Sequence, residues 1–209
     1  MTVPALSLEA IREMNLAATR IAAANISLME EGTGLPEEDL ELFFNRLQGK
    51  SILDIGCGWG RYANQFPEAG LEYVGVDQSP EFLALAKKAH PALDFQLMDF
   101  SELAFEDNIF DGIWGCCVFG GEPKAYVPKA LAEILRVLKP DGLLFLILPN
   151  IGMSDEFAGE DWRFGPMYHS FWDSMEFSGV LRQNDQVAEV EVINREIHGS
   201  ASFLITKKQ

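Results

Sequence analysis

The chain has 209 residues, of which 48% are hydrophobic, so it can bury one sizeable core, and a single domain is the default expectation. Its formal net charge of -16 disfavours nucleic acid and anionic membranes as partners, because both carry dense negative charge. No basic region followed by an apolar run opens the chain, and no apolar stretch of about 18 residues follows, so we expect neither a signal peptide nor a membrane span.

The cysteines and histidines do not suggest a metal site. The three cysteines, two of them adjacent, do not form a disulfide framework or a zinc-ligand pattern, and the three histidines lie far apart. We therefore expect no metal and a reducing, cytoplasmic location.

The N-terminal part is predicted to be helical. Ser7 is a favourable N-cap, and apolar residues then recur at helical spacing, which predicts a helix over residues 7–30. Pro36 starts a second predicted helix with one apolar face. We expect residues 1–49 to form a helical cap over a sheet, and the first helix can also cover a bound ligand.

Residues 50–148 alternate between predicted strands and helices. A buried strand at 52–55 leads into a glycine-rich turn, after which Tyr62, Ala63 and Phe66 are spaced to start a helix. The other expected elements are strands at 71–77, 93–98, 110–116 and 143–148, helices at 79–89 and 126–138, and a turn at 139–142. Continuous apolar runs indicate strands covered on both faces, so we expect an α/β fold with a doubly wound, mostly parallel sheet and helices on both faces.

The pattern changes after residue 148. Residues 149–172 lack periodicity but carry interleaved aromatic residues, which is typical of a functional segment, and we expect a lid or substrate segment here. Residues 173–209 are predicted to form a helix at 173–183 and two strands joined by a turn at 198–200. All of these parts are expected to belong to one domain.

The glycine-rich turn predicts a ligand site. A strand, a tight glycine turn and a helix N-terminus place backbone N–H groups against a bound ligand. Here Gly56, Gly58 and Gly60 follow Asp54. A dinucleotide fingerprint requires a glycine where this chain has Arg61, which disfavours a nicotinamide-dependent dehydrogenase.

Two acidic residues follow the next predicted strands. Carboxyl ends of parallel strands lie at the ligand-binding edge of an open α/β sheet. Asp77 can accept hydrogen bonds from both hydroxyls of a ribose, and Asp99 can accept from an adenine amino group. Met98 and Phe100 flank Asp99 with polarizable and aromatic surface. The sequence therefore predicts an adenosine-containing ligand.

On these motifs, residues 50–148 resemble the core of the class I (Rossmann-like) S-adenosylmethionine-dependent methyltransferases of the small-molecule type. Asp54–Gly60 resembles motif I, Val74–Pro80 the ribose motif and Gln96–Asp99 the adenine motif. The resemblance implies a seven-stranded sheet with an antiparallel last strand, S-adenosylmethionine as cofactor and S-adenosylhomocysteine as product. The motifs and the resemblance together lead us to expect these cofactor-binding residues: Asp54, Gly56, Cys57, Gly58, Arg61, Asp77, Gln78, Met98, Asp99, Phe100 and Cys116.

The acceptor is less defined than the cofactor. Many members of this family carry a histidine run after the strand that corresponds to residues 110–116. This chain has residues 119–122 there, so no role of those histidines can be transferred. We expect a small-molecule acceptor between the first helix and the aromatic segment, with contacts from Trp162, Phe164, Tyr168 and Trp172. A base is needed only for a hydroxyl or protonated amine, and His169 is the predicted base because its ordinary pKa is about 6.5.

Several alternatives stay open at this point. The acceptor atom can be oxygen, nitrogen or carbon. A non-catalytic S-adenosylmethionine-binding module that regulates a partner is the alternative function. Both a monomer and a homodimer are compatible with the sequence.

Overall fold

The computed structural model describes residues 6–27, 37–149, 153–161, 164–195 and 199–209. The strands are β1 (Ser51–Ile55), β2 (Glu72–Asp77), β3 (Asp94–Leu97), β4 (Phe110–Cys116), β5 (Leu138–Pro149), β6 (Asp155–Asp161), β7 (Gly165–Phe171), β8 (Val187–Arg195) and β9 (Ser200–Lys207). The helices are α1 (Leu8–Ala24), α3 (Glu37–Arg46), α4 (Gln65–Glu68), α5 (Pro80–Ala89), α6 (Val127–Val137) and α7 (Ser174–Gln183), with a short 3₁₀ helix at Lys124–Tyr126.

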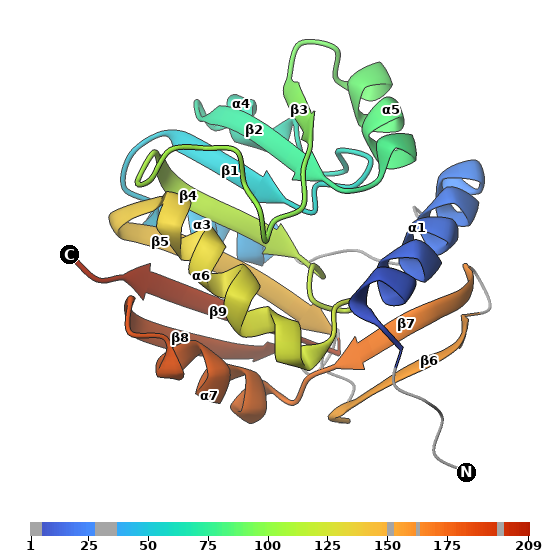
Figure 1. Ribbon diagram of the computed structural model, residues 1–209. Coiled ribbons are helices and arrows are strands. Elements are labelled where there is room, and N and C mark those ends of the chain that lie inside the picture. The colour runs from blue at the N-terminus through green and yellow to red at the C-terminus, as the bar shows by residue number, and fades with distance from the viewer. Residues whose placement is uncertain (1–5, 28–36, 150–152, 162–163, 196–198) are drawn as a thin grey trace.

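A seven-stranded sheet in the order β3-β2-β1-β4-β5-β9-β8 forms the centre of the molecule (Figure 1). The first five strands in this order are parallel to one another, and β9 is antiparallel to both of its neighbours. The last strand of the chain thus inserts between β5 and β8. This arrangement confirms the expected mostly parallel, seven-stranded sheet with an antiparallel last strand.

Both faces of the sheet are covered, because successive side chains of a strand point to opposite faces. In β4, Ile113 belongs to the apolar cluster that contains α6 residues, whereas Trp114 belongs to the cluster that contains Phe43 of α3. Trp114 stacks on Phe145 of β5 with ring centroids 4.9 Å apart. These residues are fully buried, and each such side chain contributes about 1.5–3 kcal/mol through burial. The doubly wound arrangement is therefore confirmed.

Helix ends follow local capping. Ser7, the predicted N-cap of α1, accepts a hydrogen bond from the N–H of Ala10, and Ser79 caps α5 in the same way by accepting from the N–H of Phe82. However, α1 ends at Ala24, and Asn25 interrupts the helix predicted over residues 7–30, although residues 26 and 27 are again helical. The side-chain amide of Asn25 donates to the carbonyl of Ile21 at 2.8 Å, which satisfies an end-of-helix acceptor and favours termination there. Residues 28–36 lie outside the described residues.

Two predictions in the core need correction. The helix expected from Tyr62 is shorter, because α4 begins only at Gln65. Pro67 lacks an N–H and is tolerated only in the first turn of a helix, which excludes an earlier start. In the strand that follows α6, Leu138 pairs with Phe110 and the next pair is Leu143 with Gly112. The residues between them, expected as a turn after the helix, therefore lie inside β5 as a bulge.

The segment expected to lack regular structure forms an antiparallel ribbon of β6 and β7. Figure 1 shows α1 lying beside β7, away from the centre of the sheet. The N–H of Tyr168 in β7 donates to Oδ1 of Asn15 in α1 at 2.9 Å. The predicted C-terminal helix and strands are confirmed as α7, β8 and β9, and the turn at 198–200 falls partly outside the described residues. No helix in the described part of the chain is long and apolar enough to cross a membrane.

Candidate cofactor and acceptor site

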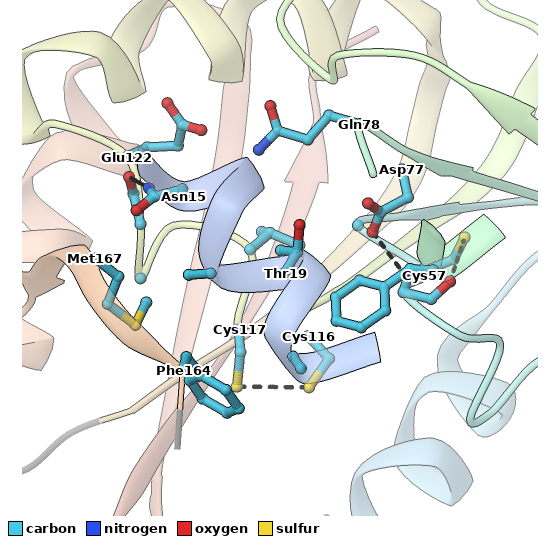
Figure 2. A pocket seen from close by; sticks show the side chains of 18 of the residues that line it. Asn15, Thr19, Cys57, Asp77, Gln78, Cys116, Cys117, Glu122, Phe164 and Met167 are labelled. Atoms are coloured by element: carbon cyan, nitrogen blue, oxygen red, sulfur yellow. Dashed lines mark hydrogen bonds between the residues drawn. The ribbon is translucent and has the colours of Figure 1, made fainter. Parts of the chain in front are cut away.

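A cavity of about 600 Å³ opens at the carboxyl ends of β1, β2 and β4, and α1 and β7 cover it. Figure 2 shows Asp77 and Cys57 at one side of this cavity and Met167 at the other, with Thr19 of α1 between them. The cavity is large enough for a ligand of several hundred daltons. Its floor therefore comes from the middle of the chain, and its cover comes from segments near both ends.

The glycine turn after β1 supplies part of the floor. Gly56 and Gly58 have φ angles of 63° and 55°, in the left-handed region that favours glycine. A Cβ atom on Gly56 would lie 2.7 Å from Cγ1 of Val118, whereas a Cβ atom on Gly58 would meet nothing within 4 Å. Gly56 is therefore required for packing and backbone shape, and Gly58 leaves open space on the cavity side.

Asp77 at the end of β2 is held by the turn itself. Its Oδ2 atom accepts a hydrogen bond from the N–H of Gly58 at 2.9 Å, and Oδ1 accepts from the N–H of Ser79 at 2.8 Å. Burial raises the pKa of Asp77, and these hydrogen bonds oppose that shift. Each oxygen keeps a further lone pair, so the carboxylate can accept from two neighbouring hydroxyls of a ligand.

Asp54 lies beneath the turn. Its carboxylate is 5% exposed and accepts a hydrogen bond from the hydroxyl of Tyr73 at 2.8 Å. Burial raises the pKa of Asp54 to about 7, and the bond from Tyr73 opposes this shift. The N–H of Cys57 donates to the carbonyl of Val76, which fixes the turn against β2. Both predicted residues line the cavity.

Two adjacent thiols lie where β4 ends. The Sγ atoms of Cys116 and Cys117 are 3.7 Å apart, as the dashed line in Figure 2 marks. The thiol of Cys116 donates to Cys117, which raises the pKa of Cys116 and lowers that of Cys117. Arg61, which also lines the cavity, favours the thiolate form electrostatically. The structure thus brings the predicted residues Arg61 and Cys116 into one cavity.

The expected adenine-binding residues divide into two groups. Gln78 and Phe100 line the cavity, but Met98 and Asp99 do not. Asp99 forms an ion pair with Arg12 of α1 and accepts a hydrogen bond from the N–H of Ser101. The adenine role of Asp99 stays a prediction, and it requires Arg12 to share this carboxylate with a ligand.

The expected acceptor-binding residues also divide. Phe164 and His169 line the cavity, together with Met167 and Phe171. Tyr168 lines a separate hollow on the other side of β7, because neighbouring strand residues point to opposite faces. Trp172 is 4% exposed and packs against Phe177 in the core, with ring centroids 5.1 Å apart. Tyr168 and Trp172 therefore do not reach the cavity, and Trp162 lies outside the described residues.

Asn15 and Glu122 are two of the cavity residues that the sequence analysis did not single out. The amide of Asn15 donates to the carbonyl of Gly121 at 2.6 Å and accepts from Tyr168, so it joins α1 to the loop after β4 and to β7. The second, Glu122, is 5% exposed, and burial raises the pKa of its carboxyl to about 7. No local motif marks either residue, because their neighbours are distant in sequence.

Metal ligands do not gather in the described part of the chain. Among those residues there is no group of three histidine, cysteine, aspartate or glutamate side chains arranged to hold a metal ion. The three cysteines are free thiols. The cavity walls therefore offer backbone N–H groups, carboxylates, thiols and aromatic rings to a ligand.

The fold and the position of the cavity define the class I Rossmann-like methyltransferase architecture. Residues 53–146 match the family model described as a methyltransferase domain. The chain therefore contains a class I S-adenosylmethionine-dependent methyltransferase domain, and S-adenosylmethionine is the cofactor of this class.

Two curated relatives and one solved structure illustrate the match. A demethylmenaquinone methyltransferase of Renibacterium salmoninarum is 40% identical over 100 residues, which cover 46% of this chain and 40% of that protein. A malonyl-[acyl-carrier protein] O-methyltransferase of Buchnera aphidicola is 30% identical over 152 residues, which cover 70% of this chain and 54% of that protein. The chain thus spans about half, or less, of the length of these curated relatives.

The solved structure is that of 1,6-didemethyltoxoflavin-N1-methyltransferase of Burkholderia thailandensis, with bound 1,6-didemethyltoxoflavin and S-adenosylhomocysteine. It is 18% identical, has a TM-score of 0.75, and the match covers 100% of this chain and 94% of that chain. At this identity the likeness shows the fold.

Proposed function

We propose that this protein transfers the methyl group of S-adenosylmethionine to a small molecule that binds beneath α1 and β7. The observation that carries this proposal is the single cavity that joins the glycine turn and Asp77 to an aromatic wall on β7. A module that only binds S-adenosylmethionine needs the glycine turn and Asp77 but no aromatic wall. A transferase needs both parts, because donor and acceptor must be held side by side.

The residues at the floor fit the cofactor. A glycine at position 58 leaves open space, and the carboxylate of Asp77 retains lone pairs for two ribose hydroxyls. Gln78, Phe100 and Cys116 would line the same bound molecule. When bound, S-adenosylmethionine supplies a methyl group on a sulfonium, whose departure as a neutral sulfide needs no proton.

The cover fits an apolar acceptor. Phe164, Met167 and Phe171 present rings and a thioether to the cavity, and His169 lies among them. The ring of His169 lies 5.3 Å from that of Phe157 and 5.8 Å from that of Phe171, between centroids. Such a wall excludes water and favours planar, apolar molecules over sugars or peptides. The relatives named for demethylmenaquinone and toxoflavin precursors are compatible with this acceptor class.

The test separates cofactor binding from transfer. Calorimetric titrations with S-adenosylhomocysteine, NAD and NADP should show binding of the first compound only. Methyl-labelled S-adenosylmethionine is then incubated with a panel of planar phenols, quinols and nitrogen heterocycles, and labelled products are identified by mass spectrometry. Binding of S-adenosylhomocysteine without transfer to any panel member would favour the non-catalytic module. Binding of NAD would contradict the cofactor assignment.

Location and assembly are further proposals. We infer a cytoplasmic location from the three free thiols, which a reducing compartment maintains. Both a monomer and a homodimer agree with the cavity, because one chain supplies all of the walls that we describe.

A further inference from the structure

Glu122 is a buried carboxyl group that lines the cavity. It belongs to the loop after β4, it is 5% exposed, and its Oε2 atom has no hydrogen-bond partner among the residues that the structure describes. Leaving a buried acceptor unpaired costs about 1–3 kcal/mol, and more for a charged group. Oε2 itself has almost no accessible surface, but Glu122 lines the cavity, so a rotation of the carboxyl group would let a ligand that donates a hydrogen bond supply the missing partner.

The loop holds this carboxyl in place. The carbonyl of Gly120 accepts from the N–H of Ser170 in β7 at 2.8 Å, and the carbonyl of Gly121 accepts from Asn15 in α1 at 2.6 Å. Figure 2 shows Glu122 beside Asn15, at the side of the cavity where α1 meets this loop. The two anchors immediately before Glu122 prevent its backbone from moving outward to solvate the carboxyl.

The surroundings of Glu122 set its charge. Burial is the main cause of its raised pKa of about 7, Asp99 raises the pKa further, and Arg12 lowers it. Below this pH the carboxyl is neutral, and above it the carboxylate is a base. A group that changes protonation near neutrality is suited to proton transfer in either direction.

We propose that Glu122 accepts the proton of the methyl acceptor, and that this acceptor is therefore a planar apolar molecule with an O–H or N–H nucleophile. This inference rests on the proposed function and narrows its substrate class. It also assigns to Glu122 the role that the sequence predicts for His169.

The step balances in atoms and electrons. The O–H or N–H bond of the acceptor breaks, and its proton goes to the carboxylate of Glu122. The lone pair left on oxygen or nitrogen forms the bond to the methyl carbon, and the carbon–sulfur electron pair stays on the sulfur of S-adenosylhomocysteine. Glu122 then returns the proton to solvent when the product leaves.

A binding experiment tests the O–H contact without requiring turnover. The protein is saturated with S-adenosylhomocysteine and titrated with 2-naphthol and with 2-methoxynaphthalene, which lacks the hydroxyl donor. We expect the wild type to bind 2-naphthol about 10-fold more tightly, and Glu122→Leu to bind both alike. The leucine variant should fold, because it removes an unpaired buried carboxyl. Equal affinities in the wild type, or no binding of either probe, would overturn the inference.

The pH dependence of the same titration separates Glu122 from His169. From about pH 5.5 to about pH 8.5, 2-naphthol should bind the wild type several-fold more tightly as Glu122 ionises, because hydrogen bonds to a charged acceptor are stronger. Glu122→Gln should show no such rise. The matched control is Glu72→Gln, the same change at an exposed residue of β2, which should retain it.

The outcomes of the two proposals are distinguishable. If the increase in 2-naphthol affinity with pH persists in Glu122→Gln and disappears in His169→Asn, the role of Glu122 is overturned and the proposed function stays intact. Failure of the wild type to bind S-adenosylhomocysteine would contradict the proposed function itself. Each variant is therefore first titrated with S-adenosylhomocysteine, and we expect its affinity to match the wild type.

Discussion

Replacing Asp77 by alanine should weaken the binding of S-adenosylhomocysteine by about 1.5–3 kcal/mol, which is about 10- to 150-fold in Kd. The magnitude follows from the hydrogen bonds of this carboxylate. Oδ1 and Oδ2 each already accept one backbone N–H, from Ser79 and Gly58, and each retains a lone pair for a ribose hydroxyl. Alanine removes the charged acceptor and also leaves those two N–H groups without it.

The assay is calorimetric titration of S-adenosylhomocysteine into the wild type and into folded Asp77→Ala protein. Asp94→Ala is the matched control, because Asp94 is an exposed aspartate at the start of β3. It therefore lies at the amino ends of the parallel strands, away from the cavity at their carboxyl ends. We expect the control to bind like the wild type. If Asp77→Ala has a native circular dichroism spectrum and an unchanged Kd, the ribose assignment is wrong.

Three further predictions concern stability and metal dependence. Because the folded pKa of Glu122, about 7, exceeds its ordinary value of 4.5, its stabilising contribution is present below pH 4.5 and is lost as pH rises through 7. Between about pH 4.5 and about pH 8 the free energy of unfolding of the wild type should therefore fall by about 3 kcal/mol more than that of Glu122→Gln, as measured by urea unfolding. The same pH dependence in both proteins would contradict this. Asn15→Ala should lower the free energy of unfolding by about 1–3 kcal/mol because Gly121 and Tyr168 lose buried partners, and an unchanged denaturation midpoint would refute it. Methyl transfer should persist in the presence of a chelator, and restoration of lost activity by magnesium would show that expectation to be wrong.

The parts of the fold that follow from local patterns are predictable from the sequence. β4 has the predicted bounds, and Ser79 followed by Pro80 marks the start of α5 because side-chain capping and a fixed φ act within a few residues. The glycine turn and Asp77 follow from the same short-range logic. Pro67 is also a local signal: because proline is tolerated only in the first turn of a helix, it indicates that α4 starts later than Tyr62.

The β6–β7 ribbon was missed for a different reason. Strand prediction relies on alternation between a buried apolar face and a solvated polar face. In β7, Met167 and His169 face the cavity while Tyr168 faces a second hollow, so neither face is plainly polar. Aromatic residues on both faces hide the period of two.

The site residues that were missed depend on long-range contacts. Asn15 and Gly121 are 106 residues apart, and Asn15 and Tyr168 are 153 apart. Glu122 is notable only because the fold buries it, and a glutamate in a loop otherwise resembles a solvated residue. Burial and distant pairing are properties of the assembled structure and have no local sequence pattern.

The bridge through Asn15 has a consequence for the order in which the molecule assembles. Closing contacts between distant residues costs loop entropy and slows folding, so the floor of the cavity, built from residues 51–122, can form before its cover. The cover joins α1 to the β6–β7 ribbon, which lies more than 100 residues later in the chain, and it is expected to be among the first regions to open in the native state. Ligands that span floor and cover should therefore slow hydrogen exchange most strongly in α1, on the opposite wall of the cavity from the glycine turn.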